Sequence, residues 1–170
     1  MQPGEALDVA AQVAVTLAGF AGIAVVFRPQ SLHQWSEVDK FRLRLLLSNS
    51  TMPLVWSLFG ILLFTVDPPL SWVWRWCSAF GIVTMVPYIA YNSRSGSRIL
   101  RTHQVAISRV LYYAIALTGS VAFLLQLANL VWNRFWPFFF AIFFYLVAAI
   151  VQFMRLLLLP PHQQGGSPSE

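Results

Sequence analysis

The chain has 170 residues, of which 58% are hydrophobic and only 10% are charged, and its formal net charge is +5. Soluble domains carry about 25% charged residues, so this composition excludes an ordinary soluble domain and indicates that the bilayer is the solvent. The single cysteine, Cys77, excludes an internal disulfide and a thiolate metal cluster.

Five charge-free runs, each of about 18 residues or more, mark candidate membrane spans and leave no room for a soluble catalytic domain: 9–27, 45–66, 76–93, 110–133 and 135–154. The sequence therefore predicts an all-α polytopic membrane protein, a bundle of five transmembrane helices in a single domain over 1–160. The spans are expected at 7–27, 45–66, 70–92, 110–132 and 135–159. The remaining segment, 161–170, is expected to be a disordered tail.

The first span is expected to be retained rather than cleaved. Its flank carries Glu5 and Asp8 but no Lys or Arg, whereas a signal peptide needs a positive N-terminal region. Small residues let helices approach closely in a membrane, and this span is predicted to pack through Ala11, Ala18, Gly19 and Gly22. Packing inside the bundle is the favoured interpretation of the side of the helix that carries these small residues, and a ligand or ion contact is the alternative.

The second helix is predicted to begin at Ser36, because Asp39 three residues later resembles a capping box. Its membrane part contains a polar stretch at 48–51, followed by Pro53. These side chains can satisfy the carbonyl that the proline frees, or they can form a binding site with the first span, toward which Asn49 is expected to point. The candidate intramembrane polar patch comprises Gln12, Thr16, Ser48, Asn49, Ser50 and Thr51.

The loop between the third and fourth spans is expected at 93–108 and contains arginines but no acid. Its second half, from Ile99, is compatible with a surface helix that leads into the fourth span. Basic segments beside spans contact anionic lipid, so headgroup contacts are predicted for Arg42, Arg44, Arg94, Arg98 and Arg101. Asn133 is expected to cap the fifth helix. That helix is hydrophobic all round and rich in aromatic residues, so it is expected to face lipid or to pack against another subunit.

The basic residues also predict how the chain is threaded. Cytoplasmic loops carry an excess of Lys and Arg, and an outside N-terminus with an inside C-terminus places nine basic residues in the cytoplasm: Arg28, Lys40, Arg42, Arg44, Arg94, Arg98, Arg101, Arg109 and Arg155. Only Arg75 and Arg134 then lie outside. Tryptophans concentrate at membrane interfaces, and this threading gathers five of them at the outer one: Trp72, Trp74, Trp76, Trp132 and Trp136.

The chain lacks the residues that catalysis and metal binding need. No Asp, Glu, His, Lys or Arg lies in the middle of a predicted span, and the three histidines fall in loops or in the tail. A proton-coupled transporter usually carries a deep ionisable residue, and an active site needs a nucleophile, a base and an orienting group. We therefore expect no enzyme, no cofactor, no metal site and no nucleic-acid partner.

Two segments in the first third of the chain resemble a group of small bacterial multi-span inner-membrane proteins of unknown function. The first is GFAGIAVVFR at 19–28; the second is Trp35-Ser36 followed by DKFRLRLL at 39–46. The resemblance implies a bacterial inner membrane and supplies no catalytic or binding residues.

Three functions are compatible with the sequence. The first is a non-enzymatic membrane protein that acts by helix–helix association, as a homo-oligomer or as an accessory subunit of a membrane complex. The second is a small oligomeric channel or carrier lined by the neutral polar patch. The third is a binder of lipid or of an apolar cofactor, held by Trp56 and the interface tyrosines. The expected partners are anionic lipid headgroups and either a second copy or another membrane protein.

Overall fold

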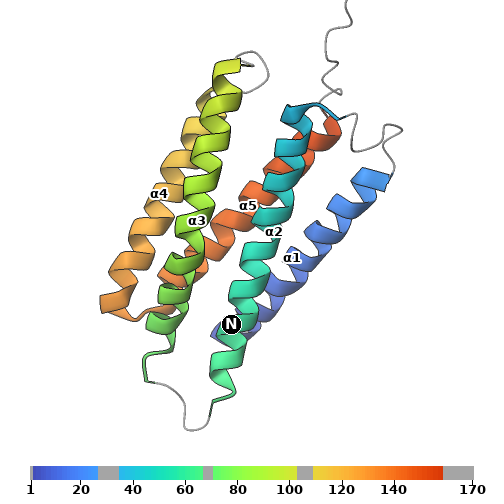
Figure 1. Cartoon of the computed structure of the whole chain (residues 1–170). Coiled ribbons are helices and arrows are strands. Elements are labelled where there is room, and N and C mark those ends of the chain that lie inside the picture. Colours follow the sequence, from blue (N-terminus) through green and yellow to red (C-terminus); the bar gives the residue numbers. More distant parts are fainter. Residues whose placement is uncertain (1, 27–34, 67–70, 103–108, 159–170) are drawn as a thin grey trace, which may run out of the picture.

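The computed structural model describes residues 2–26, 35–66, 71–102 and 109–158, with side chains except at 24, 97–112 and 158. Helices dominate these ranges, in the order α1 (Pro3–Val26), α2 (Glu37–Phe64), α3 (Val73–Thr102), α4 (Arg109–Trp132) and α5 (Phe135–Leu158) (Figure 1). The protein is therefore all-α. The expected tail at 161–170 lies outside the described residues, as do residues 27–34, 67–70 and 103–108 between the helices.

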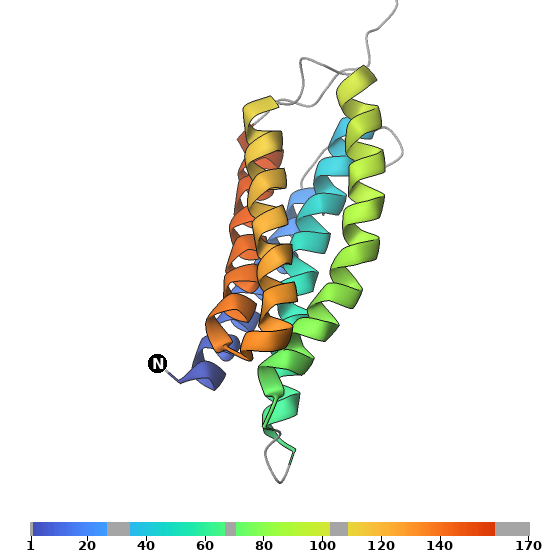
Figure 2. The same ribbon diagram turned by 90° about the vertical axis from the view of Figure 1, so that its left-hand side faces the viewer.

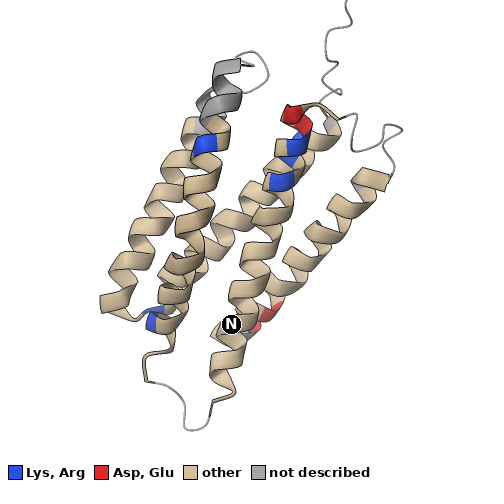
Figure 3. Cartoon of the chain, viewed as in Figure 1, with Lys and Arg blue, Asp and Glu red and all other residues tan. Residues whose placement is uncertain are grey.

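Successive helices run in opposite directions, so the bundle has two chemically different ends (Figure 3). The basic end contains the start of α2 and the last turns of α3 and α5, and its described basic side chains are Lys40, Arg42, Arg44, Arg94 and Arg155. The tryptophan end contains the opposite helix termini, and four of its tryptophans are exposed: Trp72, Trp76, Trp132 and Trp136. This separation matches the two interfaces of a bilayer.

Four of the described helices are long and apolar enough to cross a membrane, over Pro3–Ile23, Glu37–Phe64, Tyr113–Trp132 and Phe135–Leu157. They indicate an integral membrane protein. The third predicted span lies in α3, which is not among the four, because Trp, Tyr, Pro and Asn residues lower the hydropathy of its apolar run.

The predicted loop at 93–108 is wrong over 93–98, where α3 continues as a helix; the helix present from Ile99 is the end of α3, which runs to Thr102. The segment contains no proline, and its one glycine, Gly96, weakens a helix by only about 1 kcal/mol relative to alanine. Nothing local therefore ends the helix at the predicted position.

The predicted start of α2 is confirmed. Ser36 is the N-cap, and its Oγ accepts a hydrogen bond from the backbone N–H of Asp39 at 3.1 Å. In the polar stretch before Pro53, the hydroxyls of Ser50 and Thr51 donate to carbonyls one turn earlier, at 2.9 and 2.8 Å. These hydroxyls thus bond within α2, although not to the carbonyl of Asn49 that the proline frees.

The contact face of α1 within the bundle differs from the predicted stripe. Its buried residues are Ala6, Leu7, Ala10, Ala14, Leu17 and Ala21. The closest approach is at Gly60 of α2, where an added Cβ would lie 2.7 Å from Cδ1 of Leu7. In the predicted stripe, Ala11 and Ala18 are only partly buried, while Gly19 and Gly22 are exposed with no atom within 4 Å of an added Cβ. The alanine series spaced every three or four residues is the one that fits a neighbouring helix.

Helix α5 is central to the bundle, while its other side carries exposed apolar residues such as Phe143 and Ile150, so that facing lipid or another subunit remains a prediction for that side only. It packs against each of the other helices and passes behind α2 and α3 in Figure 1. Its buried side carries Phe138 and Tyr145, whose rings lie 6.2 and 5.3 Å from that of the fully buried Trp56. An all-apolar sequence fits such a position because neighbouring helices surround it on several sides.

Two asparagines join α3, α4 and α5 at the tryptophan end. Asn129 Nδ2 donates to Ser78 Oγ at 2.7 Å, and its Oδ1 accepts from the backbone N–H of Arg134 at 2.8 Å. Asn133 has a φ of 52°, and its N–H closes α4 on the carbonyl of Asn129. Its Oδ1 accepts from the N–H of Arg75 at 3.0 Å, so Asn133 caps α3 and not α5 as expected.

Candidate binding cavity

A cavity of about 230 Å³ lies at the basic end, lined by residues of α2, α3, α4 and α5. Figure 2 shows α3 and α4 close together at the tryptophan end and diverging toward the basic end. The lining residues of α2 and α5 are mostly buried, whereas four on α3 and α4 are exposed: Ile89, Ser93, Ala116 and Ser120. The cavity is therefore closed toward α2 and α5 and accessible from the side of α3 and α4.

The end of the cavity nearest the helix termini is positively charged. Arg42 of α2 and Arg155 of α5 both line it, and their like charges act on each other. Arg42 is 4% exposed, and its NH1 nitrogen lies 3.2 Å from Oδ1 of the buried Asp39. Arg155 is partly buried and forms no ion pair within the described part of the chain. Arg42 thus has a carboxylate partner, whereas no ion pair is found for Arg155 among the described residues.

Two neutral amides with unused hydrogen-bonding atoms also line the cavity. Gln152, one turn before Arg155, is 4% exposed, and its Oε1 has no partner among the described residues. Asn92 of α3 has a buried Nδ2 that likewise lacks an acceptor there. Buried polar atoms are nearly always hydrogen-bonded, so these two atoms mark a place that a ligand or water can complete.

The deeper walls of the cavity are apolar. They are formed by Met85, Ile115, Gly119, Phe144, Tyr145 and Ala148. Engineered apolar cavities of roughly 150 Å³ bind benzene, so this space holds an apolar group somewhat larger than one ring. The cavity therefore combines a charged end with an apolar interior.

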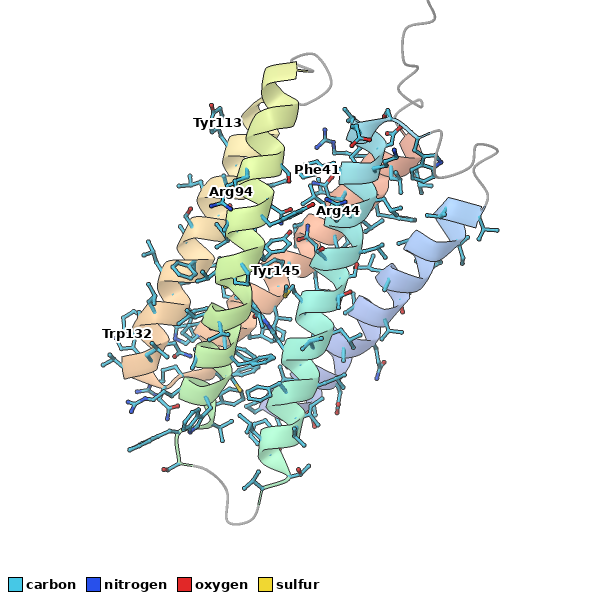
Figure 4. All side chains as sticks on the ribbon, in the orientation of Figure 1. Phe41, Arg44, Arg94, Tyr113, Trp132 and Tyr145 are labelled. Atoms are coloured by element: carbon cyan, nitrogen blue, oxygen red, sulfur yellow. The ribbon has the colours of Figure 1, made fainter. Side chains whose placement is uncertain are left out.

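The floor of the cavity is fixed by hydrogen bonds and ring contacts. The hydroxyl of Tyr88 donates to Asn49 Oδ1, and the Tyr88 and Tyr145 rings meet edge to face with centroids 5.6 Å apart. Beneath them, Trp56 Nε1 donates to Thr84 Oγ1 at 2.9 Å. Figure 4 shows Tyr145 between α2 and α3, deeper in the bundle than Phe41 and Arg44. Because these side chains restrain one another, the apolar interior is preformed.

The predicted polar patch does not gather at one place within the protomer. Asn49 is buried and lines the cavity, but it bonds Tyr88 of α3 rather than approaching the first helix. Ser50 is buried, and Ser48 is partly buried, yet neither lines the cavity. The other three members are exposed: Gln12, Thr16 and Thr51.

The arginines predicted to contact headgroups lie in different environments. Arg42 points inward and is buried, whereas Arg44 is exposed and lies over the ring of Tyr91, 5.3 Å from its centroid. Arg94 is exposed. The side chains of Arg98 and Arg101 lie outside the described residues.

Sequence reasoning missed the cavity because its members come from four helices. A local signal did exist on α5, where Tyr145, Ala148, Gln152 and Arg155 follow helical spacing along one side. For Arg155, the sequence predicts only a position at the cytoplasmic interface. The spacing places a charge and an amide on the same side as the buried aromatic ring.

Among the described residues, no three His, Cys, Asp or Glu side chains lie close enough to hold a metal ion. Comparison of this chain with protein-family models, with curated proteins and with solved structures gives no match.

Proposed function

We propose that this chain is a non-enzymatic integral membrane protein that binds a lipid or another apolar molecule of the bilayer in the cavity at the basic end. The observation that carries the proposal is the cavity itself. It has apolar walls within the membrane-crossing part of the bundle, and polar atoms without partners at one end. Ligand sites in general combine mostly apolar walls with a few polar groups.

The proposed setting is a bacterial inner membrane with five spans, the N-terminus outside and the C-terminus in the cytoplasm. The resemblance of the first third of the chain supports the choice of membrane. The positive-inside rule supports the orientation, since Arg75 and Arg134 are the only basic residues assigned to the outer side. The basic end, and with it the mouth of the cavity, then lies in the cytoplasmic half of the bilayer.

Filling the cavity tests this function. Ala116 lines the cavity and is exposed, so Ala116→Phe adds a ring to the cavity without displacing buried core. Ala114 is also exposed on α4 and does not line the cavity, so Ala114→Phe is the matched control. We expect one oleyl alcohol per chain in the wild type and in the control by native mass spectrometry.

Affinity for oleyl alcohol in Ala116→Phe should fall at least about tenfold, which corresponds to about 1.4 kcal/mol. Equal affinity in the two variants would place any bound molecule outside the cavity. Failure of the wild type to bind oleyl alcohol or any other single-chain oleyl lipid would reject the proposed function.

Helix association remains the second candidate, because Gln12 is exposed near the middle of the first candidate span. Its side chain makes no hydrogen bond within the described part of the chain, and an amide left without a partner in hydrocarbon is costly. A second copy or another membrane protein at the outer side of α1, with Thr16, Gly19 and Gly22, would supply that partner. The channel or carrier alternative lacks comparable support, because the six residues of the polar patch do not line one cavity within the protomer.

A further inference from the structure

We propose that the cavity selects an anionic amphiphile, with its carboxylate or phosphate group at Arg155 and Arg42 and its hydrocarbon part against the apolar walls. This inference rests on the proposed function and names the chemical class of the ligand. It is carried by the cluster of two guanidinium groups and two incompletely bonded amides at one end of an otherwise apolar cavity.

The charge balance at this end favours an anion. Asp39 opposes Arg42 at 3.2 Å, and Arg155, on the neighbouring helix, forms no ion pair within the described residues. One positive charge is therefore uncompensated in a partly buried place, where a second cation also acts on it. Removing an unpaired charge from water is unfavourable, and a bound anion offsets that cost. Guanidinium groups match carboxylate and phosphate oxygens in geometry as well as in charge.

The amides fit the same headgroup. Asn92 presents a buried N–H that lacks an acceptor among the described residues. Gln152 offers either its oxygen or its nitrogen, because rotating the amide by half a turn exchanges the two. Donors from α3 and α5 thus stand beside the guanidinium groups of α2 and α5, and all four side chains line one cavity.

The shape of the site favours an amphiphile over a small inorganic anion. A free phosphate would leave the walls at Met85, Ile115 and Phe144 uncovered. The exposed lining residues of α3 and α4 give a lateral route from the bilayer. Arg155 lies in the last turn of α5, where an acidic headgroup can remain near the interface while its chain enters the cavity. Basic pockets between membrane helices bind acidic lipid headgroups in this way.

The test compares probes that share a hydrocarbon chain and differ in charge. The purified full-length protein is titrated with oleate and with oleyl alcohol, and separately with lysophosphatidate and with monoolein, by native mass spectrometry in a neutral detergent. We expect the wild type to prefer the anionic member of at least one pair by about tenfold or more in Kd. The pair that shows the preference identifies the headgroup as carboxylate or phosphate.

The variants assign this preference to the cluster. Arg155→Gln should reduce the ratio of the two affinities to near one, and Arg155→Lys, which keeps the charge, should retain most of it. Arg134→Gln removes an exposed charge at the tryptophan end and should leave the ratio unchanged. If Arg155→Gln fails to fold, Arg155→Met, which keeps an unbranched side chain without the charge, should likewise reduce the ratio to near one.

Each result bears on a distinct claim. Equal binding of anionic and neutral probes by the wild type would overturn this inference and leave the proposed function standing. A preference that survives in Arg155→Gln would also overturn it. Inorganic phosphate alone should not displace the bound anionic probe at equal concentration, and displacement at that concentration would reject the amphiphile in favour of a small anion. Absence of binding by any oleyl probe would reject the proposed function as well.

Discussion

Asn129 is expected to be one of the most important polar residues for the stability of the bundle. It is fully buried and makes two hydrogen bonds between elements, to Ser78 Oγ at 2.7 Å and from the N–H of Arg134 at 2.8 Å. Its third contact, with the carbonyl of Trp74 at 3.5 Å, is too long to count. Interhelical hydrogen bonds in membranes average about 0.6 kcal/mol, so the two bonds together contribute about 1.2 kcal/mol.

Asn129→Ala also leaves the N–H of Arg134 without its acceptor and opens a small cavity around Ser78. A buried donor without a partner costs about 1–3 kcal/mol, so the total loss is expected to be about 2–4 kcal/mol. Reversible unfolding by sodium dodecyl sulfate in mixed micelles measures the free energy of unfolding. A double-mutant cycle with Ser78→Ala should give a coupling energy between about 0.6 and 1.7 kcal/mol.

Thr118→Ala is the matched control for this experiment. Its exposed hydroxyl bonds only the carbonyl of Ala114 in its own helix, at 2.9 Å, so the change should alter the free energy of unfolding by less than about 0.5 kcal/mol. If Asn129→Ala destabilises no more than this control, or if its coupling with Ser78 is zero, the described junction of α3, α4 and α5 does not hold the bundle together.

Two further predictions concern the membrane and the subunit contact. In a Cys77→Ala background, cysteine at Gly4 should react with an impermeant thiol reagent added to intact cells and cysteine at Ser95 should not; the reverse pattern would invert the orientation. Gln12→Leu should shift the protein in detergent from an oligomer to a monomer with its free energy of unfolding preserved, as measured by light scattering and unfolding; a monomeric wild type would remove the second candidate function.

The features that could be predicted from the sequence are local ones. The lengths of apolar runs are set by the bilayer thickness, and counting residues predicts five spans, of which four are confirmed as candidate membrane helices. The N-cap of α2 depends only on Ser36 and its next few neighbours, and its prediction from the sequence is confirmed. The predicted end of α3 is wrong because Arg and Ser residues are typical of a membrane interface, whereas a segment that contains arginines can continue as a helix.

Packing faces and the cavity depend on several helices at once, which a single sequence does not specify. α1 carries small residues on several sides, so the sequence cannot distinguish the buried Ala10 and Ala14 from the outward Gly19 and Gly22. An arginine near the end of a membrane span is typical of a headgroup contact. Only the arrangement of the neighbouring helices shows that Arg42 points inward and lines the cavity. Which side of a helix faces the bundle can be assigned only when the neighbouring helices are known.

The central position of α5 has a consequence for biosynthesis. The helix follows the other four described helices in the chain, yet it is their common neighbour. Until it enters the membrane, Trp56 lacks the two aromatic rings that cover it, and the asparagine junction lacks the N–H of Arg134. Chains in which α5 has not yet entered the membrane therefore present incompletely buried polar and aromatic groups to the bilayer. Insertion of α5 is thus the step at which a folded bundle is distinguished from a substrate for quality-control proteolysis.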